Sequence, residues 1–388
     1  MARLDQPIAS TSTSVPLLKK TKTPKASKSA PLKPSASAPP LGKFLASSEK
    51  HIRDKAVASL SKFLSAGNKK STNAQGDDED ADAELVVGDL DWSKECKVDK
   101  RLAPLEMAKL WKGIFFCFWM SDKPLVQQAL AQALANLTLD VRPKSKTAGR
   151  VERFRAAMCY LRGFWEAVVR EWSGLDRLRL DKFYLLIRRF VHAAFMLLKR
   201  EEWDPTAIAE YNALLTGPGG PLHVEDSRIP ASLGYHLADI YLTELERAFP
   251  LSTEAPSART LPLRQVLQPF LTTLALSPTS TLFNRVTENV ITPLLDDALP
   301  AKEEPARKRR KKVVSEIIKP TFPGILGNAT EADEPTEVEE GEMGEKEKVG
   351  RMVLKAIFEE GGKKETNEVN RRRLYLICRE REEGGVEL

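Results

Sequence analysis

Arginine and lysine side chains are concentrated on one predicted helix, residues 177–200, where they can contact phosphate groups. Arginine suits this chemistry because its planar guanidinium donates two parallel hydrogen bonds to neighbouring oxygens. Lys123, which precedes another predicted helix, joins the same set. The candidate RNA- or partner-binding residues are Arg177, Arg179, Lys182, Arg188, Arg189, Lys199, Arg200 and Lys123.

Two polar lines carry most of these cations when residues 177–200 are projected onto a helix. The first line holds Asp181, Arg188, His192 and Lys199, and the second holds Lys182, Arg189 and Arg200. Fixed cations on a rigid helix favour RNA or phosphate contact. The alternative, which stays open, is a solvated face whose cations pair with nearby carboxylates. Those carboxylates are Asp176, Asp181, Glu201 and Glu202.

A second basic signal is the string ARKRRKK at residues 306–312, which contains six consecutive basic residues. Such a run in a flexible segment is typical of nuclear import, because an import receptor can reach it. Direct RNA contact is the alternative. The predicted nuclear-import run consists of Arg307, Lys308, Arg309, Arg310, Lys311 and Lys312.

Residues that could perform catalysis or bind metal do not form recognisable groups. None of the four histidines has the HxxxH or HExxH spacing that places two ligands on one helix face. GxSxG, P-loop and GxGxxG motifs are missing, and the four cysteines lie far apart without a CxxC pair. We therefore expect no enzyme activity, cofactor, metal or small-molecule substrate, a reducing compartment, and a solvated surface position for His192.

Charge is distributed in blocks, which the formal net charge of +6 conceals. Residues 1–43 hold eight Lys or Arg against one acid, with seven Pro and seven Ser, and this composition predicts a disordered tail. A transit peptide is the alternative, but the prolines would break the amphipathic helix it needs. Residues 77–84 and 331–347 carry six and nine acids. No apolar run approaches the roughly 20 residues of a membrane span, so we expect no membrane contact.

The helices that must position the candidate residues are predicted from apolar positions recurring every three or four residues. We expect helices near 47–65, 104–120, 124–137, 151–172, 177–200, 205–216, 232–248, 261–276 and 280–298. Large aromatic side chains supply the core, to which we assign Trp111, Phe115, Trp119, Phe183 and Phe190. The pattern predicts an all-α fold, an irregular HEAT-like array of antiparallel helical hairpins with disordered tails.

Four parts are predicted along the chain. They are a disordered basic Pro/Ser-rich tail (1–43), a helical array (44–299, with an acidic loop at about 67–90), a disordered linker with the basic run and an acidic stretch (300–346), and short C-terminal helices (347–388). The helices expected at 347–360 and 367–382 are too short to be stable alone, so we expect them to dock on a partner. KPTFPGILGN (319–328) resembles a docking peptide, because its small apolar patch lies between prolines.

Two long strings, KLWKGIFFCFWMSDKPLVQQ (109–128) and FWEAVVREWSGLDRLRLDKFYLLIRRF (164–190), carry a family resemblance. They resemble the ribosomal RNA-processing protein 1 family, nucleolar assembly factors of the large ribosomal subunit. The resemblance extends to residues 45–65 and, more weakly, to 356–377. It implies an all-helical fold and a non-catalytic role in pre-rRNA processing within early nucleolar precursors of the large subunit (pre-60S).

The resemblance also implies contacts with pre-rRNA, other large-subunit assembly factors and ribosomal proteins. We therefore predict a non-catalytic scaffold for ribosome biogenesis in the nucleus and nucleolus. The alternative is a HEAT-like nuclear adaptor for transport or signalling, which binds proteins without contacting RNA. These two functions differ in whether the basic face of residues 177–200 meets RNA.

Overall fold

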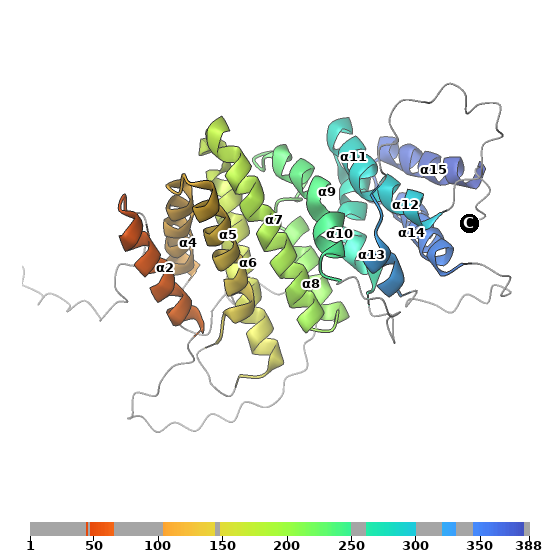
Figure 1. Ribbon diagram of the computed structural model, residues 1–388. Helices are drawn as coiled ribbons and strands as arrows, with labels where there is room; N and C mark the ends of the chain where they lie inside the picture. The colour runs from red at the N-terminus through yellow and green to blue at the C-terminus, as the bar shows by residue number, and fades with distance from the viewer. Residues whose placement is uncertain are drawn as a thin grey trace, which may run out of the picture. The chain divides into compact units, whose positions relative to one another are not determined.

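The computed structural model of the chain is built from helices (Figure 1). It describes residues 44–45, 47–65, 104–143, 148–249, 261–299, 320–330 and 344–383, all of which belong to one compact unit, Pro40–Leu388. Within these ranges no strand forms, and one isolated parallel bridge joins Leu261 to Ala329. The predicted all-α helical array is confirmed.

Each predicted helix agrees with the observed helices within three residues at its ends, apart from one segment described below. The helices of the array are α2 (Lys50–Ser65), α4 (Pro104–Trp119), α5 (Pro124–Asp140), α6 (Arg150–Glu171), α7 (Arg177–Arg200), α8 (Pro205–Thr216), α9 (Ala231–Glu246) and α10 (Leu263–Leu276). They are followed by α11 (Ser280–Val286), α12 (Thr292–Ala298), α13 (Pro323–Asn328), α14 (Glu345–Gly362) and α15 (Glu368–Glu383).

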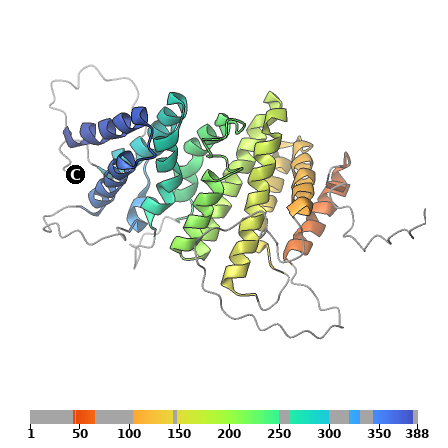
Figure 2. The same ribbon diagram turned by 180° about the vertical axis from the view of Figure 1, so that it is seen from behind.

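Neighbouring helices form two layers within this unit (Figures 1 and 2). In one layer α5 contacts α7, α7 contacts α9 and α9 contacts α11. In the other, α4 contacts α6, α6 contacts α8 and α8 contacts α10. Two hydrogen bonds show that α5 and α7 run in the same direction. Near the N-terminal end of α7, Lys182 donates to the carbonyl of Ser121, which precedes α5. At the C-terminal end of α7, Arg200 donates to the carbonyl of Leu139, near the C-terminal end of α5. Consecutive helices therefore alternate between layers as antiparallel hairpins.

The segment predicted as one helix, residues 280–298, is interrupted by a wider turn. α11 ends at Val286, a π-helical turn spans Thr287–Ile291, and α12 begins at Thr292. Pro293 explains the interruption, because proline lacks an N–H and its ring clashes with the carbonyl four residues earlier in a regular α-helix. A π-helical turn widens the backbone at that point and lets the helix continue.

An aromatic cluster holds α4, α6 and α7 together. The Trp111 ring lies 4.8 Å from Tyr160, 5.6 Å from Phe164 and 5.7 Å from Phe190, measured between ring centroids. Phe164 and Phe190 stack almost in parallel, with centroids 3.8 Å apart. Each of these rings is buried, so the cluster contributes both apolar burial and specific ring contacts.

The five aromatic residues assigned to the core divide into two groups. Trp119, at the end of α4, is only partly buried, and the Arg179 guanidinium covers one face of its ring. The other assignments to the core are confirmed. These buried residues are Trp111, Phe115, Phe183 and Phe190.

α13, α14 and α15 pack against other helices of this chain. Glu246 of α9 accepts hydrogen bonds from the backbone N–H groups of Gly324 (2.7 Å) and Ile325 (2.8 Å), in the first turn of α13. These N–H groups have no partner within their helix, so a carboxylate stabilises them. α14 contacts α10 and α12, and α15 contacts α14 and α10. The surface that covers the buried faces of α14 and α15 is therefore supplied by the chain itself.

Several predictions fall outside the described residues. These are the tail at 1–43, the acidic loop at about 67–90, the nuclear-import run at 307–312 and most of the linker at 300–346. Together with the domain boundaries, they stay predictions.

Gly163 of α6 lets α4 and α6 approach closely, because a Cβ atom there would lie 2.3 Å from Cδ1 of Trp111. We expect Gly163→Ala to lower the free energy of unfolding by about 1–3 kcal/mol, since the buried ring must move. Urea denaturation measures this change. Gly174→Ala is the control, because a Cβ atom there has no neighbour within 4 Å. Equal stability of the two variants would contradict the close approach.

Candidate nucleic-acid interface

Lys182 lies against the C-terminal end of α4, not on the surface. Its side chain is buried, and its ammonium donates hydrogen bonds to the carbonyl oxygens of Trp119 (2.6 Å) and Ser121 (2.8 Å). Carbonyls at a helix C-terminus lack intrahelical partners and carry partial negative charge, so a cation stabilises them. Burial lowers the pKa of this ammonium, and the negative charge of Asp122 opposes the shift. Lys182 therefore caps α4.

Two more cations of α7 bind carbonyl oxygens at the ends of other helices. Lys199 donates to the carbonyl of Ala248, just beyond α9, at 2.6 Å. Arg200 donates to the carbonyl of Leu139, near the end of α5, at 2.9 Å. These residues join α7 to the helices on either side of it in the same layer, so their first role is structural.

Glu244 of α9 is a buried carboxylate surrounded by basic side chains. Its side chain has no exposed surface, and it pairs with Arg188 of α7 (2.9 Å) and Arg247 (3.0 Å). Nδ1 of His192 lies 3.8 Å from the same carboxylate. His192 was predicted to be solvated, but its side chain is only 22% exposed because α9 packs beside it. Sequence reasoning missed Glu244, whose only signal is an acid among the apolar positions of 232–248.

The two carboxylates that follow α7, which the sequence offered as partners for its cations, have different environments. Glu201 is only 4% exposed, and Glu202 is exposed. Glu201 pairs with Arg150 of α6 (2.7 Å) and with Arg200 (3.1 Å). A carboxylate at this depth needs such partners, because an unpaired buried charge is costly.

Arg177 and Lys123 remain exposed at the N-terminal ends of α7 and α5. These helices run in the same direction, so both cations lie at the same end of the pair. The guanidinium of Arg179 stacks 3.9 Å from the centroid of the Trp119 ring and also pairs with Asp176. Helix N-termini favour anions, and the arrangement is therefore suited to phosphate. The structure does not bring Arg189, which is half-buried on α7, into any ion pair among the described residues.

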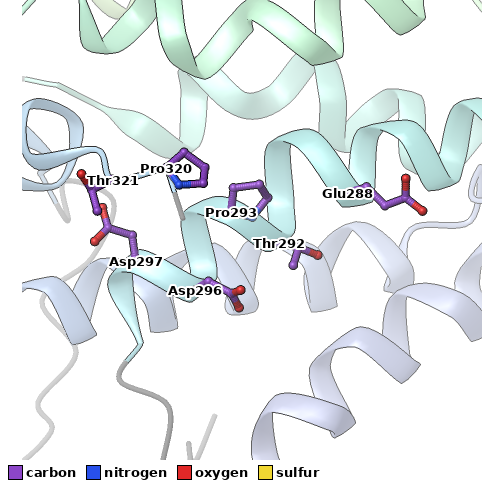
Figure 3. Close-up of a pocket in the computed structure, with 7 residues that line it drawn as sticks. All are labelled: Glu288, Thr292, Pro293, Asp296, Asp297, Pro320 and Thr321. Carbon is purple, nitrogen blue, oxygen red and sulfur yellow. The ribbon is translucent and has the colours of Figure 1, made fainter. Parts of the chain in front are cut away.

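A pocket of about 270 Å³ lies beside α12 (Figure 3). Its lining residues are Glu288, Thr292, Pro293, Asp296, Asp297, Pro320 and Thr321. Asp296 pairs with Arg381 at 2.8 Å, and Asp297 lies 3.7 Å from Nζ of Lys346. Both aspartates thus lie beside cations of the chain itself.

Across the described ranges, no cluster of three or more His, Cys, Asp or Glu side chains is placed to hold a metal ion. None of the helices in those ranges combines the length and apolar character that a membrane span requires. A groove of about 550 Å³ runs between α8 and α10. Its lining combines apolar and amide side chains with Arg264, whose guanidinium pairs with Glu359.

Lys182→Met keeps the apolar stem of the side chain and removes its ammonium. We expect the free energy of unfolding to fall by about 1–3 kcal/mol, because the Trp119 and Ser121 carbonyls lose a charged donor. Urea denaturation measures the effect. Lys123→Met is the matched control, because Lys123 is an exposed lysine in the segment that joins α4 to α5. We expect it to change the free energy of unfolding by less than about 0.5 kcal/mol. Similar losses in both variants would refute the capping role.

The chain is similar in sequence to a family of nucleolar proteins. A family model described as "Nucleolar protein, Nop52" matches residues 36–376. The human and mouse proteins named ribosomal RNA processing protein 1 homolog B are each 30% identical to this chain over an alignment that covers 69% of it. The alignment covers only 30% of the human protein and 31% of the mouse protein, so the chain spans about a third of these relatives' length. Human homolog A is 27% identical over 89% of this chain and 71% of its own length. These matches confirm the resemblance found in the sequence, and the chain belongs to the Nop52 family of nucleolar proteins.

Proposed function

We propose that the chain is a non-catalytic nucleolar scaffold for large-subunit (pre-60S) assembly and pre-rRNA processing. The family match over residues 36–376 carries this proposal, because the relatives are named for ribosomal RNA processing. The stacked helical hairpins support it, since such arrays offer extended surfaces for partners. The partners are pre-rRNA, other large-subunit assembly factors and ribosomal proteins, with a nuclear import receptor at the basic run.

The RNA contact lies at the common end of α5 and α7. Lys123 and Arg177 are exposed there, while the cations of Lys182, Lys199 and Arg200 are bound to carbonyl oxygens inside the array. A phosphate held by two exposed cations at helix N-termini needs no rearrangement of the fold.

A protein-binding adaptor for nuclear transport or signalling, without RNA contact, is the second candidate. The internal use of the α7 cations favours it, because less positive charge remains at the surface for phosphate. The two functions differ in the salt dependence of RNA binding, since phosphate contacts release counterions and weaken as salt rises.

Lys123→Glu combined with Arg177→Glu tests the RNA contact. We expect weaker binding of a single-stranded RNA oligonucleotide by the purified chain, and a salt dependence reduced by about 0.7 per lost phosphate contact. Titration at several salt concentrations measures both. In cells that carry only this variant, we expect large-subunit rRNA precursors to accumulate on northern blots.

The matched control is Lys109→Glu combined with Lys112→Glu, which makes the same charge change at exposed positions of α4. We expect it to leave the salt dependence unchanged. Equal weakening by both pairs would mean that binding follows net charge and not this site. RNA binding that is absent from the unmodified chain, together with normal rRNA precursors on its depletion, would instead favour the adaptor.

Deletion of residues 307–312 tests the import run within the full chain. We expect a fluorescently tagged chain without this segment to lose nuclear accumulation, because the receptor loses its contiguous basic contacts. Microscopy measures the ratio of nuclear to cytoplasmic signal. Deletion of the acidic residues 77–82 is the control for a segment of similar length, and unchanged accumulation after removal of 307–312 would eliminate the import role.

A further inference from the structure

The last helical hairpin exposes large apolar side chains on its outer face. Phe358 of α14 is 51% exposed, and Val369 and Leu376 of α15 are 63% and 43% exposed. α15 packs against α14 and α10 through its opposite side, where Leu374 and Cys378 are buried. Large apolar side chains that stay exposed next to one another on a folded surface indicate a binding surface.

The centre of this face is a pair of aromatic rings. The centroids of Phe358 and Tyr375 lie 5.1 Å apart. Tyr375 rests on the backbone of α14, since a Cβ atom at Gly361 would lie 3.0 Å from its Cε1 atom. The rings are therefore held in place before any partner binds, and little conformational entropy is lost when they are covered.

Cations lie beside the rings on both helices. Lys355 is one turn before Phe358, and Arg379 is one turn after Tyr375. α14 and α15 form an antiparallel hairpin, so Lys355 and Arg379 fall on the same side of the aromatic pair. Both are exposed, which places positive charge next to the apolar centre.

Arg372 lies one turn before Leu376 on the outer face of α15. Its guanidinium is 3.4 Å from Glu368, and both side chains are more than half exposed. An ion pair this exposed contributes little to stability, so a partner carboxylate can replace Glu368 at little cost. Leu376 is thus an apolar position between two arginines, Arg372 and Arg379.

The composition of this face matches a protein partner better than RNA. Val369 and Leu376 have no aromatic ring on which a base can stack. Glu368 and Glu380 are exposed on the same helix, so its outer face carries charges of both signs and not the continuous positive charge that suits a phosphate backbone. Aromatic and arginine side chains around an apolar centre are typical of protein–protein interfaces.

We propose that this face docks an amphipathic helix of a partner protein. Its apolar stripe covers Phe358, Tyr375 and Leu376, and its flanking Asp or Glu side chains pair with Arg372 and Arg379. Helix recognition of this kind uses apolar anchors one turn apart, and complementary charge selects the partner and its orientation. The docking site goes beyond the proposed function and does not depend on RNA contact.

A photo-crosslinking amino acid tests the proposal in the full chain. We replace Leu376 with p-benzoylphenylalanine in eukaryotic cells, irradiate, and sequence the crosslinked peptide by mass spectrometry. The expected product is a segment of another protein with apolar residues at helical spacing and acidic flanks. Arg372→Glu combined with Arg379→Glu should lower its yield about tenfold or more, because two charge pairs become repulsive.

Val151 provides the matched control, because this α6 residue is 40% exposed, close to the 43% of Leu376. The same crosslinker at Val151 should not give that product. Both arginines are exposed, and unchanged urea denaturation of the charge-reversal variant would exclude unfolding as the cause. A crosslink to RNA, to this chain itself or to a peptide without acidic flanks would overturn the proposal, as would no crosslink. The two proposals can fail separately. If the expected crosslink forms but depletion of the chain leaves rRNA processing normal, the docking site stands and only the scaffold function is refuted.

Discussion

The fold depends on one interaction that α7 makes repeatedly, in which a side-chain cation binds the carbonyl oxygens at the end of a neighbouring helix. Lys182 does so at α4, Arg200 at α5 and Lys199 just beyond α9. Each contact satisfies acceptors that helix geometry leaves without partners and places positive charge at the negative end of a dipole. Because these contacts come from opposite ends of a single helix, they fix how far α7 can slide along its neighbours.

The aromatic cluster constrains the same helix from its apolar side. Phe190 stacks on Phe164 of α6 and contacts Trp111 of α4, and Gly163 leaves the space that Trp111 fills. Apolar burial by itself is non-directional, whereas the ring contacts and the capped carbonyls each require one position of the helix. Apolar burial and carbonyl capping thus both hold α7 in place. α7 takes part in both because its apolar arc and its polar lines face different neighbours.

The sequence predicted the helices and most of the core because both follow local patterns. α7 and α8 begin and end where apolar spacing, turns and prolines place them, and Trp111 is buried as its surroundings imply. Partners of the α7 cations were not predictable in this way. Lys199 and its acceptor are 49 residues apart, and Lys182 and Trp119 are 63 residues apart. The π-helical turn before Pro293 was also missed, because a proline restricts the backbone without specifying whether the helix ends or widens.

A cluster of cations on a helix is therefore ambiguous until its acceptors are known. On α7 the helix-end carbonyls and the buried Glu244 compete with external phosphate for the same guanidinium and ammonium groups. The internal acceptors are fixed in position and partly shielded from water, so they bind these cations without the ordering cost that a mobile ligand requires. External ligands are left with the more exposed cations, such as Lys123 and Arg177 at the N-terminal ends of α5 and α7. Among the described residues, no neighbouring helix buries these side chains.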